Sequence, residues 1–296
     1  MNDRITRRGF LAVAIPASAA LAVGASQSAQ DKPVKLHNNK GLRMNMLPKN
    51  LDVADAFRLA VDSGFNQMEP FATFDDNLVR EIKHAAQEAR IRIGSVANPM
   101  NWKYPLSSGD PDVAKKGNEA QTAALRNAHF WGADAILMIP GVVTPAVSYR
   151  DAWVRSRKEI EQLIPLAEQL RVVIALEEVC AQSKFLLSPL EFVRYIDDFK
   201  SPWVKAYFDV GNVMPVGYPE DWIHTLGERI VKVHLKDWNP KTRKFVDLGD
   251  GAVDWPAVRQ SFIDIGYKGT FTTELSGGDA AYLRNLSQRI DRLLLD

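Results

Sequence analysis

The chain has 296 residues, of which 46% are hydrophobic and 25% are charged, and its formal net charge is +1 at pH 7. These values are typical of a globular protein with one large domain or two small ones. A nearly neutral chain has no electrostatic reason to bind nucleic acid or an anionic membrane, and a single cysteine, Cys180, excludes an internal disulfide and a thiolate metal cluster.

Residues 1–30 predict an export signal. They have a basic start that contains Arg7 and Arg8, an apolar stretch over residues 10–25 and a small polar end. The apolar stretch is interrupted by Pro16 and is shorter than the roughly 20 residues that a membrane span needs. The segment TRRGFL is similar to a twin-arginine signal. We therefore expect an exported, periplasmic protein with no membrane span in the mature chain, anchored only if the signal is not cleaved.

From residue 41 onward, short β-rich segments alternate with longer segments of helical periodicity. The predicted strands are 42–47, 65–70, 91–98, 135–141, 172–179, 204–212, 230–237 and 269–276. The predicted helices are 52–63, 77–90, 113–131, 150–170, 188–199, 219–227, 254–266 and 279–294. This alternation is typical of an α/β fold, the (β/α)₈ TIM barrel, whereas an open doubly wound sheet has fewer strands and a glycine-rich first turn that this sequence lacks. We predict one barrel domain over 41–296, after a linker over 31–40.

In such a barrel the functional residues lie at the carboxyl ends of the strands. The polar residues at the predicted ends are Glu69, Glu177, Glu178, Asp209, His234, Lys236, Asp237 and Glu274. Because side chains alternate along a strand, only one of Glu177 and Glu178 can face the barrel axis. Converging carboxylates without a cation would repel one another. Three oxygen donors and one imidazole suit a divalent cation such as Mn²⁺, Mg²⁺, Co²⁺ or Zn²⁺.

The segments LEEV, YFDVGN, VKVHLKD and FTTEL, together with FVDLGDGAVDWPAV, resemble the xylose isomerase-like superfamily of sugar isomerases and epimerases. The relatives in question are the ketose 3-epimerases, the pentulose-5-phosphate 3-epimerases and hydroxypyruvate isomerase. The resemblance implies that Glu177, Asp209, His234 and Glu274 bind one divalent metal ion, for which Mn²⁺ is the first candidate. It also implies that Glu177 and Glu274 are the catalytic acid–base pair, while Glu178 turns away from the metal to cap or pair elsewhere.

The expected activity is that of a metal-dependent ketose isomerase or epimerase, which removes a proton beside a carbonyl while the metal stabilises the enediolate. Proton exchange on two faces of one carbon gives epimerisation, and transfer between neighbouring carbons gives isomerisation. We expect a small carbohydrate substrate. The oligomeric state stays open, and a homo-oligomer is one of the alternatives.

Five residues are candidates for binding this substrate. Glu69 could accept a hydroxyl hydrogen bond, and Trp102 could stack on a sugar or pack under a loop. Asn212 stands where ketose epimerases often carry a substrate-binding histidine. Lys236 and Arg243, with Lys241 as an alternative to them, are candidates for the basic residue that ketose epimerases carry after the histidine of the seventh strand.

Three alternative functions use the same scaffold. A lyase or hydrolase acting on 3-keto-glycosides could use the same site, and predicted export argues against a phosphorylated central metabolite. An endonuclease IV-like enzyme needs several zinc-binding histidines, whereas only His234 of the five histidines lies at a predicted strand end. A non-catalytic sugar-binding protein would bind a sugar without turnover.

Overall fold

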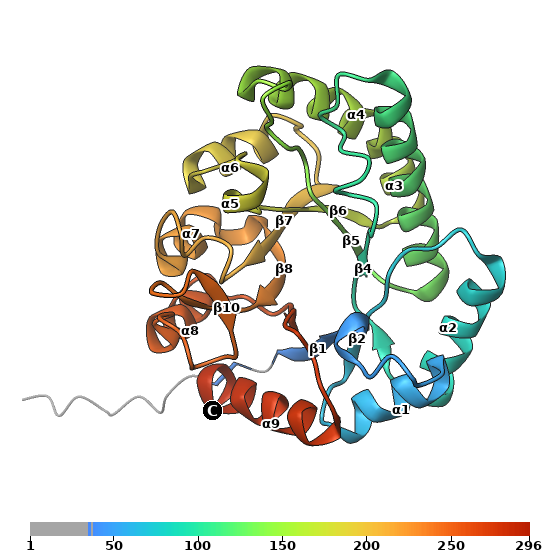
Figure 1. The fold of residues 1–296 in the computed structure, drawn as a ribbon, viewed down its shortest axis with the longest axis vertical. Coiled ribbons are helices and arrows are strands. Elements are labelled where there is room, and N and C mark those ends of the chain that lie inside the picture. Colours follow the sequence, from blue (N-terminus) through green and yellow to red (C-terminus); the bar gives the residue numbers. More distant parts are fainter. Residues whose placement is uncertain (1–34, 37) are drawn as a thin grey trace, which may run out of the picture. The chain divides into compact units, whose positions relative to one another are not determined.

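Nine parallel strands form the main sheet of this protein, which curls into a barrel surrounded by helices (Figure 1). The computed structural model describes residues 35, 36 and 38–296. The export signal predicted over 1–30 lies outside the described residues, as does part of the linker predicted over 31–40. No helix in the described residues is both long and apolar enough to cross a membrane.

The strands follow the predicted order along the chain. They are β1 (Asn39–Arg43), β2 (Gln67–Glu69), β3 (Arg92–Ile93), β4 (Val96–Ala97), β5 (Ala135–Met138), β6 (Val173–Glu177), β7 (Val204–Asp209), β8 (Ile230–Leu235) and β11 (Thr270–Thr273). Their order in the sheet is β3-β2-β1-β11-β8-β7-β6-β5-β4. The first strand, blue in Figure 1, therefore pairs with the last one, β11. Because β1 begins at Asn39, the barrel starts inside the range predicted as linker.

The barrel closes where one predicted strand, 91–98, is broken into β3 and β4. β3 pairs with β2 and β4 pairs with β5, while Phe71 forms a parallel bridge with Ala97. Gly94 lies in the break, and a Cβ at this position would overlap the side-chain amide of Gln67. The two halves of one strand thus pair with opposite neighbours, which confirms the predicted (β/α)₈ barrel.

The helices lie on the outside of the barrel (Figure 1). The eight predicted ones are α1 (Val53–Asp62), α2 (Asp76–Glu88), α3 (Pro111–Trp131), α4 (Tyr149–Leu170), α6 (Pro189–Asp197), α7 (Pro219–Leu226), α8 (Trp255–Asp264) and α9 (Ala280–Ile290). Two short helical turns, α5 (Cys180–Ser183) and η2 (Gly227–Arg229), were not predicted, and η1 (Met44–Met46) lies where a strand was predicted. The turn η3 (Asp291–Leu295) continues α9 over the end of the helix predicted at 279–294. Side-chain oxygens of Ser148, Ser188 and Asp254 accept first-turn N–H groups and so start their helices.

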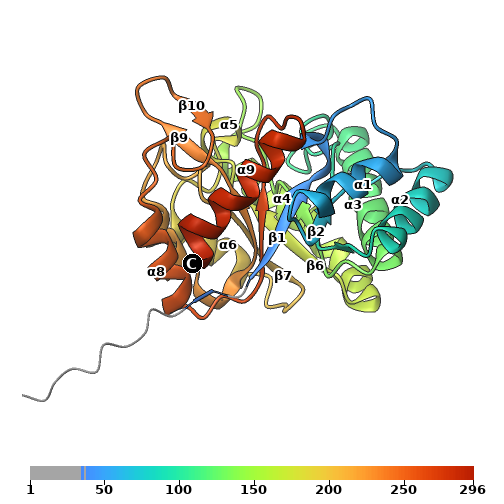
Figure 2. The same ribbon diagram turned by 90° about the horizontal axis from the view of Figure 1, so that it is seen from below.

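A small hairpin follows β8 and was not predicted. It consists of β9 (Asp237–Asn239) and β10 (Lys244–Val246), which pair antiparallel. Figure 2 shows the hairpin at the same end of the barrel as α5. Its strands have three residues each, which is too short for a recognisable alternation of polar and apolar residues.

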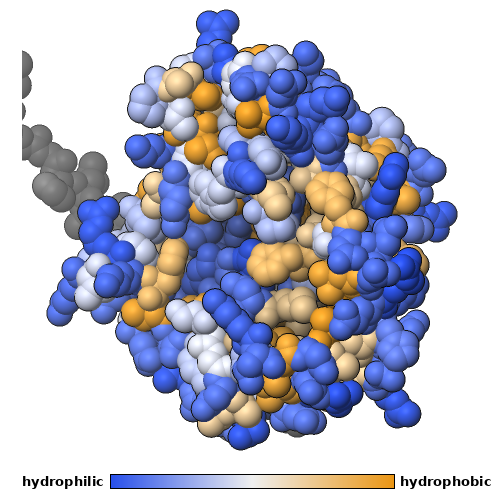
Figure 3. Space-filling view, turned by 45° about the vertical axis from the view of Figure 1, so that its right-hand side comes forward, coloured by the Kyte–Doolittle hydropathy of each residue, from blue (hydrophilic) through white to orange (hydrophobic). Residues whose placement is uncertain are grey.

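The interior of the barrel is apolar on one side and polar on the other. An apolar cluster inside the barrel consists of Ala135, Leu137, Ile139, Ala175, Val179 and Tyr207. Buried polar side chains lie elsewhere in the barrel, among them Gln67 of β2, Ser95 between β3 and β4, and Thr272 of β11. In a space-filling view the mouth of the barrel is hollowed, with hydrophilic residues at the floor of the hollow and hydrophobic residues along one side (Figure 3). The hollow at the mouth of the barrel therefore offers both polar and apolar surfaces to a ligand.

Asp237 holds the loops that follow β8. Its buried carboxylate accepts hydrogen bonds from the backbone N–H groups of Trp238 (2.8 Å), Gly249 (2.9 Å) and Val253 (3.1 Å), and from the indole N–H of Trp255 (2.9 Å). Four donors on one carboxylate join the start of the hairpin to the start of α8.

We predict that Asp237→Asn destabilises the protein by about 2 kcal/mol, because an amide cannot accept four hydrogen bonds and leaves buried donors unpaired. The melting temperature should fall by roughly 4–8 °C. Lys241→Ala, at an exposed position of the same hairpin, is the control and should change the stability by less than about 0.5 kcal/mol. Equal melting temperatures for Asp237→Asn and the parent protein would contradict the anchoring role.

Candidate functional site

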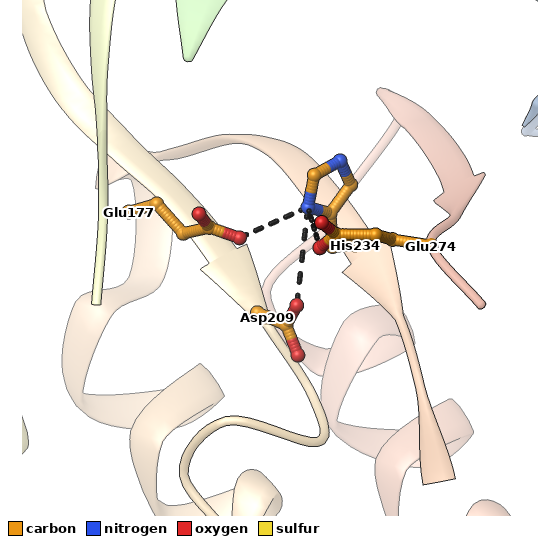
Figure 4. Close-up of side chains that lie close together, drawn as sticks. All are labelled: Glu177, Asp209, His234 and Glu274. Atoms are coloured by element: carbon orange, nitrogen blue, oxygen red, sulfur yellow. Dashed lines mark hydrogen bonds and ion pairs between the residues drawn. The ribbon is translucent and has the colours of Figure 1, made fainter. Parts of the chain in front are cut away.

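Four of the predicted site residues meet at the carboxyl ends of neighbouring strands (Figure 4). Glu177 ends β6, Asp209 ends β7, His234 lies near the end of β8, and Glu274 follows β11. Nδ1 of His234 lies 3.0 Å from Oε1 of Glu177, 3.1 Å from Oε2 of Glu274 and 3.8 Å from Oδ2 of Asp209. One ligand atom from each of the four side chains lies within 4.8 Å of the others. The arrangement has the donors and the spacing of a site for one metal ion.

His234 is held from behind by Glu69. Nε2 of His234 lies 3.0 Å from Oε1 of Glu69, while the hydroxyl groups of Ser95 and Tyr207 each donate to Oε2 of Glu69 at 2.6 Å. Burial favours the neutral form of Glu69, but His234 and Arg43 outweigh it and lower the pKa of this carboxyl to about 2. An ionised carboxylate only accepts hydrogen bonds, so Nε2 carries a hydrogen and Nδ1 is the nitrogen that faces the cluster.

These contacts differ from the role predicted for Glu69, which was to accept a hydrogen bond from a substrate hydroxyl group. Its side chain is fully buried behind His234, and both of its oxygens are already hydrogen-bonded. The structure therefore gives Glu69 a part in orienting the imidazole rather than a position for accepting a substrate hydroxyl.

The imidazole of His234 is poised to carry a positive charge. Burial opposes protonation, but the carboxylates of Glu69 and Glu177 outweigh it, so the pKa of His234 is raised above its ordinary value. The same contact lowers the pKa of Glu177 although burial acts to raise it. In the absence of a cation, a proton on His234 therefore compensates part of the negative charge of the cluster.

Two cationic side chains border the cluster. Nζ of Lys236 lies 2.9 Å from Oδ2 of Asp209 and 2.6 Å from Oε2 of Glu274. Arg43 pairs with Glu274 through Nη1 and lies 3.6 Å from Glu69 through Nε. The sequence analysis missed Arg43, because the first strand was predicted over 42–47, whereas Arg43 is its last residue and belongs to the functional end of the barrel.

Glu178 turns away from the metal-binding cluster, as expected, but it is buried. Its Oε1 accepts a hydrogen bond from the backbone N–H of Asp209 at 2.7 Å, and its Oε2 is buried without a hydrogen-bond partner. Burial, together with the charge of Asp209, raises the pKa of Glu178 well above its usual value. Glu178 thus supports the backbone of a neighbouring strand.

Asp209 is oriented by its own loop. Its Oδ1 accepts hydrogen bonds from the backbone N–H groups of Gly211 and Asn212, both at 2.9 Å. Its Oδ2 accepts no hydrogen bond and faces the cluster. One oxygen therefore fixes the side chain, and the other faces the cluster, where it pairs with the ammonium group of Lys236.

A cavity of about 440 Å³ opens beside this cluster. Glu177 and Glu274 line it, and so do the predicted substrate-binding residues Trp102, Asn212 and Lys236. Arg243 does not line this cavity: it is exposed in the turn between β9 and β10.

The loop that follows β4 also lines the cavity through Asn98 and Asn101, which the sequence analysis missed. Asn98 is the last residue of the strand predicted over 91–98 and Asn101 follows it, in the segment NPMNW beside Trp102, and this position was the available signal.

Comparisons with known proteins agree with this architecture. Residues 57–292 match the family described as xylose isomerase-like TIM barrel. L-ribulose-5-phosphate 3-epimerase UlaE of Escherichia coli is 25% identical over 246 residues, which cover 79% of this chain and 86% of that protein.

Solved structures are similar in fold. D-psicose 3-epimerase with D-tagatose, from Clostridium cellulolyticum, has a TM-score of 0.73 at 19% identity and covers 87% of this chain and 100% of that one. 3-keto-D-glucoside 4-epimerase YcjR from E. coli has a TM-score of 0.72 at 17% identity and covers 86% of this chain and 98% of that one. At such identities the likeness shows the fold alone, but the family match extends over most of the barrel. The chain belongs to the xylose isomerase-like TIM barrel family.

Proposed function

We propose that this protein is a sugar epimerase that needs one divalent metal ion and moves a proton on a carbon beside a carbonyl group. The observation that carries the proposal is the convergence of Glu177, Asp209, His234 and Glu274 beside a cavity that Glu177 and Glu274 line. Curated relatives that act as L-ribulose-5-phosphate 3-epimerases support an epimerase rather than a nuclease or a binding module.

The charges around the cluster suit a divalent cation. The buried region holds four carboxylates, those of Glu69, Glu177, Asp209 and Glu274, against the cationic side chains of Arg43 and Lys236. With His234 neutral, two negative charges are left over. Buried charge without compensation is costly, so a doubly positive ion would stabilise the site.

Two buried oxygen atoms point to the same conclusion. Oδ2 of Asp209 and Oε2 of Glu274 accept no hydrogen bond, although the ammonium group of Lys236 lies near both. Oxygen atoms that are buried without a hydrogen bond are uncommon in proteins, and cation coordination is one way to satisfy them. Glu177, Asp209, His234 and Glu274 would hold the ion, which suits Mn²⁺ first among the metals that accept mixed oxygen and nitrogen ligands.

The side chains then divide the work of proton transfer. A bound cation would supply a Lewis acid that stabilises negative charge developing on the substrate oxygens. Glu177 and Glu274 approach His234 from different strands (Figure 4), so they can face two sides of one substrate carbon. One carboxylate removes the proton and the other returns one to the opposite face. Arg43 and Lys236 hold the carboxylate of Glu274 in place.

We predict that Glu274→Gln lowers kcat about 10²- to 10⁴-fold at saturating Mn²⁺, because the amide can neither accept nor return a proton. The measurement is deuterium exchange from D₂O into a ketose, followed by NMR. The products separate epimerisation from isomerisation and from elimination. Glu168→Gln, at an exposed position on α4, is the matched control and should exchange at the parent rate. Epimerisation at the parent rate by Glu274→Gln would remove Glu274 from the mechanism.

Metal binding should release a proton from His234. The raised pKa keeps Nδ1 protonated to a higher pH than in free histidine, and a cation must displace that proton. The affinity for Mn²⁺ should therefore fall as the pH decreases through the pKa of His234 and become constant above it. Isothermal titration calorimetry in buffers of different ionisation enthalpy measures the released proton. Binding that is independent of buffer and of pH between about 5 and 8 would contradict the assignment of Nδ1 as a ligand.

We predict that Glu69→Gln weakens Mn²⁺ binding about 10- to 100-fold, because the imidazole loses the carboxylate that fixes its orientation. Tyr207→Phe is the matched variant: it removes one donor to Glu69 but keeps the carboxylate, so its loss should be smaller. Calorimetric affinities and melting temperatures of both variants test this order. The reverse order would show that Glu69 does not act through His234.

A further inference from the structure

The wall of the cavity that faces the cluster is uncharged. It is formed by Phe71, Pro99, Trp102, Leu137, Ile139 and Val179. These residues come from β5 and from the loops that follow β2, β4, β5 and β6. Trp102 is 48% exposed and so forms the outer edge of this wall. An apolar surface of this kind packs against carbon atoms of a ligand.

The cavity offers no spare positive charge to a phosphate group. Among the described residues that line it, the cationic ones are Arg43 and Lys236. Both pair with Glu274, and Lys236 also pairs with Asp209. Phosphate recognition in proteins usually uses arginine or lysine in charge-assisted hydrogen bonds. A phosphate in the outer part of this cavity would lose its hydration against apolar side chains, which is unfavourable.

Asn98 offers the cavity a hydrogen-bond donor instead. Oδ1 of Asn98 accepts a hydrogen bond from the backbone N–H of Met100 at 2.9 Å, and this contact fixes which end of the amide carries the nitrogen. Nδ2 of Asn98 is buried and has no hydrogen-bond partner, although Asn98 is 5% exposed and lines the cavity. A buried donor without a partner is costly, and a ligand hydroxyl group would satisfy it.

We propose that the part of the substrate beyond the reacting carbons is uncharged, and that Nδ2 of Asn98 donates a hydrogen bond to one of its hydroxyl oxygens. The carbon atoms of this part lie against Trp102 and the apolar wall. The substrate class is thus a neutral sugar and not a sugar phosphate, which distinguishes this chain from its relatives named for L-ribulose 5-phosphate. The proposal rests on the epimerase function proposed above.

The test compares each neutral ketose with its own terminal phosphate. L-ribulose, D-fructose and D-tagatose, alone and phosphorylated, are titrated into the Mn²⁺-loaded protein by calorimetry, and deuterium exchange is measured in parallel. We expect the neutral member of a pair to bind at least tenfold more tightly. Tighter binding of the phosphates would overturn the inference and leave the epimerase function standing. Metal-dependent binding that favours neutral ketoses, without any exchange, would instead support the inference and overturn the epimerase function.

Substitutions at Asn98 test the donor itself. Asn98→Ala should weaken binding of the preferred neutral ketose about threefold to tenfold. Asn98→Asp keeps the oxygen that accepts from Met100 but loses the N–H donor, and it should weaken ketose binding at least as much. Asn77→Ala, at an exposed position on α2, is the control and should bind like the parent protein. Melting temperatures show whether each variant is folded. Unchanged ketose affinity in folded Asn98→Ala and Asn98→Asp would remove Asn98 from recognition.

Discussion

The structure of the site depends on one constraint, the compensation of negative charge buried at the mouth of the barrel. Glu69, Glu177, Asp209 and Glu274 come from different strands and approach one imidazole, His234. Like charges held this close in a low-dielectric interior repel strongly, and the desolvation of each one adds to the cost. The protein meets this cost with cations on either side of Glu274 and with a raised pKa for His234. Burial and the charge of Asp209 raise the pKa of the neighbouring Glu178 well above its usual value, which favours its neutral form.

The barrel makes such convergence possible because parallel strands in register present their last residues together. Asp209 stands opposite His234, and Glu177 opposite Tyr207, in adjacent strand pairs. Alternation along β6 then sends Glu177 inward and leaves Glu178 to bond the backbone of β7. Leu137, Ile139 and Val179 of the apolar interior line the same cavity as Glu177 and Glu274, so a ligand there meets both ionised groups and carbon.

The periodicity of the sequence was sufficient to predict the barrel, and the resemblance of its strand-end motifs to a known family predicted the four residues that meet in the central cluster. Neither was sufficient for contacts across the barrel. β2 and β8 are separated by β1 and β11 in the sheet, so the hydrogen bond from His234 to Glu69 depends on the curvature of the whole sheet. Arg43 was missed for a local reason, since a shift of a few residues in one strand boundary moved it from the strand interior to the functional end.

Arg243 was proposed from chain proximity to His234, but the unpredicted hairpin carries it away from the cavity. The short strands of β9 and β10 have too few residues for periodicity to reveal them. Their position is instead fixed by a single carboxylate, Asp237, whose four hydrogen bonds could not be assigned without knowing where residues 249–255 return to the barrel.

That carboxylate separates two regions that are adjacent in the chain. Lys236 belongs to the charged cluster, and the very next residue clamps the hairpin and the segment leading to α8. Length changes confined to the hairpin tip, over residues 240–243, would leave in place both the hydrogen bonds of Asp237 and the contact of the Lys236 ammonium group with the ring of Phe245. Related proteins could therefore differ in the surface loops, or in the partners bound at this rim of the barrel, and still keep the same arrangement of site residues. Variation at the hairpin tip need not change the reaction.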